Sequence, residues 1–149
     1  MPHADVRIPP PVRYVFLALR HQFLPLTIVE GRRNGTPRED RICPLCRTPH
    51  VVADEVHLLF GCPILRAHQQ RIWGALAARF VEFRAAFASG SWERCFRLLM
   101  CHPDDVSVRT LLADPRRASI YLWHVMDSVA SLWWIRQQQV ELRRMAHRS

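Results

Sequence analysis

The sequence predicts a mostly α fold, a small helical domain with an inserted Cys-Cys-His-Cys loop stabilised by zinc. Apolar residues recur at helical spacing along most of the chain, turn residues separate these stretches, and three of the five cysteines fall within residues 43–62. A chain of 149 residues with 49% hydrophobic residues is long enough to bury a sizeable core. We therefore expect a single helical domain over residues 1–149, with a zinc-binding segment at about 38–66.

The N-terminal part is expected to hold one helix followed by a turn-rich stretch. A helix over 11–23 is predicted by the apolar residues Val12, Val15, Phe16, Leu19 and Phe23. Pro25 ends this helix. The next residues, LTIVE, favour a short extended run, and Asn34-Gly35 and Pro37 are turn signals.

Four more helices are expected after the cysteine-rich stretch. Apolar steps of three, four and seven predict one long amphipathic helix over 63–88, closed by Ser89-Gly90. Ser91 can cap a helix whose inward residues are Trp92, Phe96, Leu99 and Met100. A short helix follows at 106–112. Pro115 opens the last helix, whose apolar stripe is Leu122, Met126, Val129, Trp133 and Val140.

The charge is strongly positive. All 21 basic residues are arginine, and the formal net charge of +8 favours an anionic partner such as nucleic acid. GC-rich codon usage is the alternative explanation for arginine without lysine. The opening MPHADVRIPPP lacks the apolar segment of a signal peptide, and an odd number of cysteines fits a reducing compartment. We expect nucleus or cytoplasm, with the mitochondrion as an alternative, and no membrane partner.

The stretch RICPLCRTPHVVADEVHLLFGCP, residues 41–63, has two pairs of soft ligands. Cys43 and Cys46 are separated by two residues, so one tight turn can aim both thiolates at a common point. Between His57 and Cys62 we expect a helical turn with Gly61 in the left-handed region, which returns Cys62 beside His57.

The flanking residues support this arrangement. Asp54 can cap the turn that carries His57. Pro63 is expected to start the long helix, where the helix dipole favours a thiolate at Cys62.

The full pattern, Cys-x2-Cys-x10-His-x4-Cys, predicts one structural Zn²⁺ with no position open for a catalytic water. The alternative is a set of ordinary buried cysteines. His50 is the rival to His57, but it follows Pro49 in a loop expected to be exposed. Cys95, Cys101 and His102 are expected to be two buried thiols and a neighbouring histidine rather than a second metal site.

The segments EGRRNGTPREDRICPLC and DEVHLLFGCP together resemble the zinc-binding segment near the C-terminus of non-LTR retrotransposon reverse transcriptases. The resemblance covers roughly residues 13–73. It implies Cys43, Cys46, His57 and Cys62 as the zinc ligands, and it implies association with nucleic acid. The polymerase and endonuclease regions of that family have no counterpart here, so a fragment and a stand-alone relative both stay open.

Five arginines crowd the approach to the predicted metal site. A loop stiffened by zinc can present guanidinium groups to phosphate, and apolar side chains can stack on unpaired bases. Pairing with Glu30, Glu39 or Asp40 is the alternative. The candidate nucleic-acid-binding residues are Arg32, Arg33, Arg38, Arg41 and Arg47. A second basic group, at the end of the last helix, is Arg136, Arg143, Arg144 and Arg148.

No catalytic constellation stands out, and we expect a protein that is not an enzyme. The favoured function is a non-catalytic zinc-binding module that binds RNA or single-stranded DNA, with RNA preferred over duplex DNA. The alternative is a structural or interaction subunit of a larger assembly, such as a ribonucleoprotein, that keeps zinc for folding. Tryptophans at helical spacing are expected in the core, and Trp134, off the main stripe, is the candidate for a partner surface.

Overall fold

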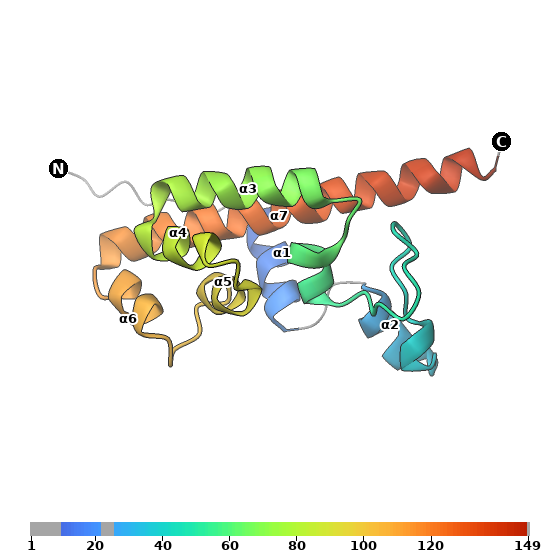
Figure 1. Cartoon of the computed structure of the whole chain (residues 1–149), viewed down its shortest axis with the longest axis horizontal. Coiled ribbons are helices and arrows are strands. Elements are labelled where there is room, and N and C mark those ends of the chain that lie inside the picture. Colours follow the sequence, from blue (N-terminus) through green and yellow to red (C-terminus); the bar gives the residue numbers. More distant parts are fainter. Residues whose placement is uncertain (1–9, 22–25, 149) are drawn as a thin grey trace.

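The computed structural model describes residues 10–21 and 26–148, and helices predominate in them (Figure 1). The α-helices are α1 (Pro10–Arg20), α2 (Thr27–Asn34), α3 (Arg66–Arg79), α4 (Val81–Ala88), α5 (Trp92–Leu99), α6 (Val106–Leu112) and α7 (Pro115–Ala146). A 3₁₀ turn, η1 (Arg38–Asp40), and a π-helical turn, η2 (His57–Gly61), lie between α2 and α3. The predicted mostly α fold is confirmed.

Two long helices form the frame of the molecule. α3 and α7 lie side by side and antiparallel, and α7 extends well past the start of α3 (Figure 1). α1 packs on α7. α4, α5 and α6 gather at the end of the α3–α7 pair where α3 finishes and α7 begins. The loop between α2 and η2 projects from the body on the same side as the C-terminal half of α7.

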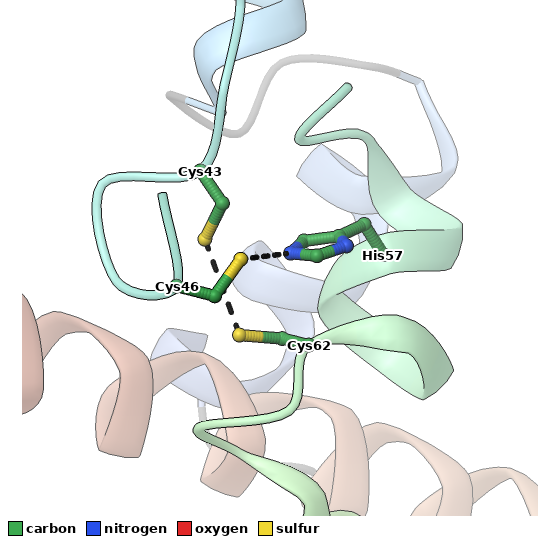
Figure 2. A group of neighbouring side chains, drawn as sticks. All are labelled: Cys43, Cys46, His57 and Cys62. Atoms are coloured by element: carbon green, nitrogen blue, oxygen red, sulfur yellow. Dashed lines mark hydrogen bonds between the residues drawn. The ribbon is translucent and has the colours of Figure 1, made fainter. Parts of the chain in front are cut away.

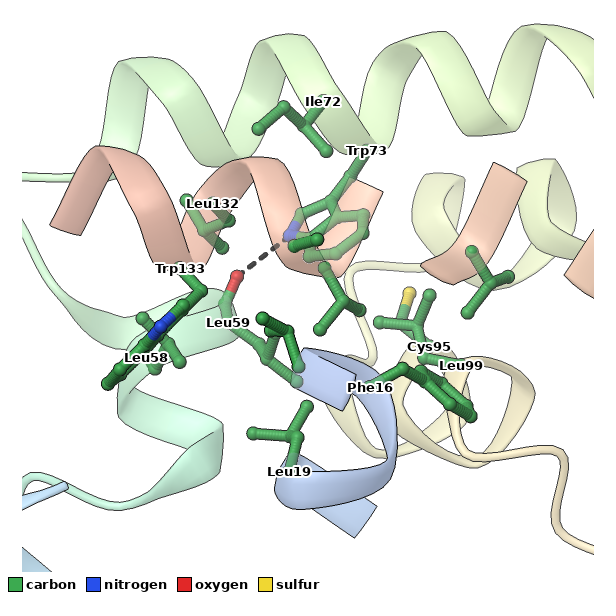
Figure 3. Packing of buried hydrophobic residues seen from close by; sticks show 14 of the residues in the cluster. Phe16, Leu19, Leu58, Leu59, Ile72, Trp73, Cys95, Leu99, Leu132 and Trp133 are labelled. Atoms are coloured by element: carbon green, nitrogen blue, oxygen red, sulfur yellow. Dashed lines mark hydrogen bonds between the residues drawn. The ribbon is translucent and has the colours of Figure 1, made fainter. Parts of the chain in front are cut away.

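The core lies where α1, η2, α3, α5 and α7 meet (Figure 3). Phe16 of α1, Leu59 of η2, Trp73 of α3 and Leu99 of α5 are all at most 2% exposed. Burial of such side chains contributes about 1.5–3 kcal/mol each. No helix among the described residues combines the length and apolarity that crossing a membrane requires.

The predicted helix over 63–88 is wrong in its extent, because Phe80 divides it into α3 and α4. Phe80 has extended backbone angles, with φ −124° and ψ 115°. The Arg84 side chain donates to the carbonyls of Ala77 and Ala78, at 2.9 and 3.0 Å, which the end of α3 leaves without helical partners. The Phe80 ring packs edge-on against Tyr121, with 5.0 Å between centroids. The break therefore allows α4 to fold back along the core.

The predicted extended run before the cysteines is also wrong, because residues 27–34 form helix α2. Ile28 and Val29 are buried, and this packing outweighs the extended preference of β-branched residues. The turn signal at Asn34-Gly35 is correct: Gly35, with φ +70°, ends α2 in the left-handed conformation. In the predicted helix over 11–23, α1 ends at Arg20, and Phe23 and Pro25 lie outside the described residues.

The later helices start as the caps predict. Ser91 accepts a hydrogen bond from the Arg94 amide at the start of α5, and Pro115 follows the capping Asp114 at the start of α7. The inward orientation predicted for Trp92 is wrong, since its side chain is 46% exposed. In the predicted α7 stripe, Val129, Trp133 and Val140 are buried, whereas Leu122 and Met126 are half-buried.

Candidate metal centre

The Cys43–Cys46 pair lies on a tight turn tied to α2. The Arg47 amide donates to the carbonyl of Cys43 at 2.9 Å and closes the turn, and Arg47 itself has a φ of +50°. An isolated antiparallel bridge joins Ile42 to Val52 across the base of the loop. The carbonyl of Ala53 then accepts from the Ile28 amide in the first turn of α2, at 3.2 Å. The turn is therefore fixed by its own closing hydrogen bond and, through residues 52 and 53, by contacts with the other arm of the loop and with α2.

The second pair lies on η2, whose wide turn sets the spacing of His57 and Cys62. The Asp54 carboxylate caps this turn by accepting from the His57 amide at 2.9 Å, as predicted. The Cys62 amide donates to the carbonyl of His57 at 2.8 Å, five residues back, which defines a π turn. The left-handed conformation predicted for Gly61 is wrong, because Gly35 and Gly90 are the described glycines with positive φ.

The start of the next helix also differs from the prediction. Pro63 opens a turn, and α3 begins at Arg66 rather than at Pro63. Cys43 and burial raise the pKa of the Cys62 thiol, and the backbone N–H groups of Ile64 and Leu65 in this turn oppose that rise. The turn thus supplies the N–H groups that the prediction had assigned to a helix terminus.

Two buried side chains of α3 anchor η2 to the core. The Gln69 side chain donates to the carbonyl of Leu58 at 2.9 Å, and the Trp73 indole donates to the carbonyl of Leu59 at 2.7 Å (Figure 3). Both carbonyls belong to a short turn that ends before it can supply helical partners. Neither role was predicted from the sequence; the i, i+4 spacing of Gln69 and Trp73 was the available signal.

The side chains of Cys43, Cys46, His57 and Cys62 converge on one point (Figure 2). Their ligand atoms all lie within 4.8 Å of one another. Cys43 Sγ and Cys62 Sγ are 4.0 Å apart, and Cys46 Sγ is 3.5 Å from His57 Nε2. Two thiolates on a tetrahedral zinc are separated by about 3.8 Å, and a thiolate and an imidazole by about 3.6 Å. The four residues therefore form a cluster that can hold a metal ion such as zinc.

The contact between the two buried thiols of the cluster favours ionisation of one of them. The hydrogen bond with Cys62 holds the pKa of the Cys43 thiol well below its usual range, against the opposing effect of burial. The His57 ring and the amides of Cys46 and Leu45 lower this pKa further. The contact with Cys43, together with burial, raises the pKa of Cys62. A thiolate at Cys43 is the form in which cysteine binds a metal.

The other cysteines and histidines considered from the sequence lie apart from this cluster. His50 is exposed, with a φ of +60°, in the loop between the two pairs. Cys95 and Cys101 are buried thiols, as predicted, and burial raises the pKa of each. Within the described residues, Cys43, Cys46, His57 and Cys62 are the one Cys/His/Asp/Glu group whose geometry suits a metal.

The five arginines predicted to bind nucleic acid, of which Arg32 and Arg33 lie in the last turn of α2, fall into two kinds. Arg32, Arg33, Arg38 and Arg47 are exposed. Arg41 is half-buried: its Nε donates to the carbonyl of Thr36 at 2.8 Å, and its side chain lies so close to Gly31 that a Cβ there would be 2.6 Å away. Arg41 therefore closes the loop onto α2. In the described part of the chain, Arg33, Arg38 and Arg47 form no ion pair with a carboxylate.

The C-terminal half of α7 meets the Cys43–Cys46 turn. Arg143 donates through Nη1 to the carbonyl of Leu45, inside the turn. A cavity of about 840 Å³ lies between the turn and α7, and Arg47, Arg136 and Arg144 line it together with Cys43. Arg136, which the sequence grouped with the basic end of the last helix, is buried, with 6% of its surface exposed.

Comparison with known proteins identifies no relative. No family model matches the chain, and no curated protein and no solved structure is significantly similar to it. The resemblance to the zinc-binding segment of retrotransposon reverse transcriptases therefore depends on the quoted motifs alone.

Proposed function

We propose that this chain is a non-catalytic module in which one Zn²⁺, held by Cys43, Cys46, His57 and Cys62, stiffens a loop that binds nucleic acid through phosphate. Three thiolates and an imidazole complete a tetrahedral coordination shell, which leaves no site for an activated water. The zinc is therefore structural, and its role is to fix the loop.

The observation that carries the proposal is the set of exposed arginines at the end of α2 and on the loop that follows it. Arg33, Arg38 and Arg47 have no carboxylate partner among the described residues, so their guanidinium groups are available to an anion. Residues 31–50 contain five arginines against Glu39 and Asp40. Guanidinium groups bind phosphate bidentately, and a fixed loop loses less conformational entropy on binding.

The C-terminal half of α7 extends this basic surface. Arg47 of the loop and Arg144 of α7 line the same cavity, so the two basic groups of the sequence meet in space. Glu30 and Glu141 also line this cavity, and Arg144 forms an ion pair with Glu141 at 3.7 Å. The exposed arginines are divided between the last turn of the short helix α2 and the irregular loop after it, and are not aligned along one helix that could enter a duplex major groove. This favours RNA or single-stranded DNA over duplex DNA.

A salt-dependent binding titration tests the proposal. Labelled single-stranded RNA, single-stranded DNA and duplex DNA are titrated against the full chain at several salt concentrations. Replacing Arg32, Arg33, Arg38 and Arg47 with Gln should weaken binding to all sequences alike. If each of the four contacts one phosphate, the logarithmic salt slope should also fall by about 3.

A matched control separates a binding site from diffuse charge. Arg94, Arg97, Arg109 and Arg116 are equally exposed and lie on α5, α6 and the start of α7. Replacing these four with Gln removes the same charge and should leave the affinity nearly unchanged. Equal losses in both variants, or no binding by the parent chain at low salt, would contradict the proposal.

The alternative is an interaction subunit of a larger assembly, which the exposed apolar side chains of the α7 tail favour. Trp134, Leu142 and Met145 are 52%, 59% and 59% exposed. Exposed aromatic and long aliphatic residues are typical of protein interfaces. A parent chain that holds zinc but binds no nucleic acid would leave this alternative standing.

A further inference from the structure

Arg136 is a buried charge without a carboxylate partner. Its side chain is 6% exposed, and no described carboxylate forms an ion pair with it. Its guanidinium donates to the Gln137 side chain at 2.7 Å and lies over the Trp133 ring, with 5.2 Å from Cζ to the ring centroid. Both partners are neutral, and a buried charge of this kind is strongly destabilising unless an opposite charge compensates it.

The cysteine cluster is a buried source of negative charge beside Arg136; the other acidic residues at this cavity, Glu30 and Glu141, are exposed. Arg136 and Cys43 line the same cavity, and α7 packs against η2, which ends one residue before Cys62 (Figure 2). Burial lowers the pKa of Arg136, whereas the thiolate of Cys43, then Glu30 and then Cys62 raise it. Glu30 is exposed to solvent, so its charge is screened more than that of the buried sulfurs.

The charge of the occupied centre is opposite to that of Arg136. One Zn²⁺ with three thiolates and a neutral imidazole carries one net negative charge. This charge is delocalised over sulfurs that the fold has largely removed from water, so a buried cation nearby stabilises it with little screening.

We propose that Arg136 is the counter-charge of the metal centre, so that zinc binding docks the C-terminal half of α7 against the Cys43–Cys46 turn. The inference rests on the proposed zinc site. The hydrogen bond from Arg143 to Leu45 is the second contact of this docking, and it orients the turn that carries the two thiolates. Groups that support metal ligands in this way affect metal affinity without touching the ion.

Competition between the full chain and a chromophoric zinc chelator, under reducing conditions, tests the role of Arg136. Arg136→Met should lower zinc affinity about 10- to 100-fold, whereas Arg136→Lys, which keeps the charge, should lose far less. Arg144→Met is the control, because Arg144 lines the same cavity from the same helix but is exposed. Unchanged affinity in Arg136→Met, or equal losses in the Met and Lys variants, would overturn the inference.

Hydrogen exchange on the parent chain gives a second test that does not depend on folding of the variants. Zinc should slow exchange of the amides of residues 137–146 more than those of residues 119–129 in the same helix. Equal changes in both segments would contradict the docking. A parent chain without zinc would refute the metal site itself, so failure of the inference and failure of the proposed function give different results.

Discussion

The indole N–H of Trp73 donates a hydrogen bond of 2.7 Å to the carbonyl oxygen of Leu59, which ties α3 to the turn that carries His57. Both residues are at most 2% exposed. One side chain therefore joins the hydrophobic core to the turn that carries His57 of the Cys/His cluster. We expect this contact to couple the stability of the core to the geometry of the cluster.

Trp73→Phe should cost about 1–3 kcal/mol of unfolding free energy, because it leaves the buried carbonyl of Leu59 without a donor. Urea denaturation of the zinc-loaded chain measures this loss. Trp134→Phe, at a residue that is 52% exposed, is the control and should change the unfolding free energy by less than about 0.5 kcal/mol. A similar small change at Trp73 would mean that the hydrogen bond does not contribute to stability.

Phe80→Ala and Trp133→Ala should each cost about 3–5 kcal/mol, because each removes a large buried ring. Phe80 is 5% exposed and packs on Tyr121, and Trp133 is 4% exposed beneath Arg136. Thermal or urea unfolding provides the measurement, and Trp92→Ala serves as the exposed control. Losses below about 1 kcal/mol at both buried positions would contradict a core shared by α3, α4 and α7.

Tyr121 should make stability fall at high pH. Burial raises the pKa of its hydroxyl, which donates to the carbonyl of Leu98 at 2.7 Å. Above the unfolded pKa of about 10, the unfolded chain loses this proton while the folded chain keeps it, so rising pH favours unfolding. The slope attributable to Tyr121 should be about 1.4 kcal/mol per pH unit.

Tyr121→Phe isolates this effect. The variant should be about 1 kcal/mol less stable at pH 7, where the hydrogen bond is lost. The difference between parent and variant should narrow above pH 10, since the variant has no hydroxyl to titrate at this position. Parallel stability curves for the two chains through that range would refute the assignment.

The sequence predicted the parts of the fold that local chemistry determines. The caps at Ser91 and Asp54 and the opening proline of α7 each act within one helical turn, and the structure has them as predicted. The convergence of the two ligand pairs was also predictable, because each pair is built by its own short turn.

The parts that the sequence did not predict depend on contacts between distant residues. The break at Phe80 lies within residues that favour a helix, and it exists because Phe80 packs on Tyr121 and Arg84 completes the end of α3. The burial of Arg136 depends on how α7 meets the cysteine turn. A signal was nevertheless present, because Arg136 follows Trp133 by three residues and precedes Val140 by four, and so lies on the apolar stripe of α7.

The zinc content of the purified chain, measured by elemental analysis without added metal, is the most direct test of the metal site. We expect about one zinc per chain, and we expect it to be lost in Cys43→Ser and in Cys62→Ser. Cys95→Ser and Cys101→Ser, at buried cysteines outside the cluster, should keep the metal. Chelation should unfold at least the region around residues 40–65. A parent chain without zinc, or full zinc retention in both cluster variants, would contradict the metal site.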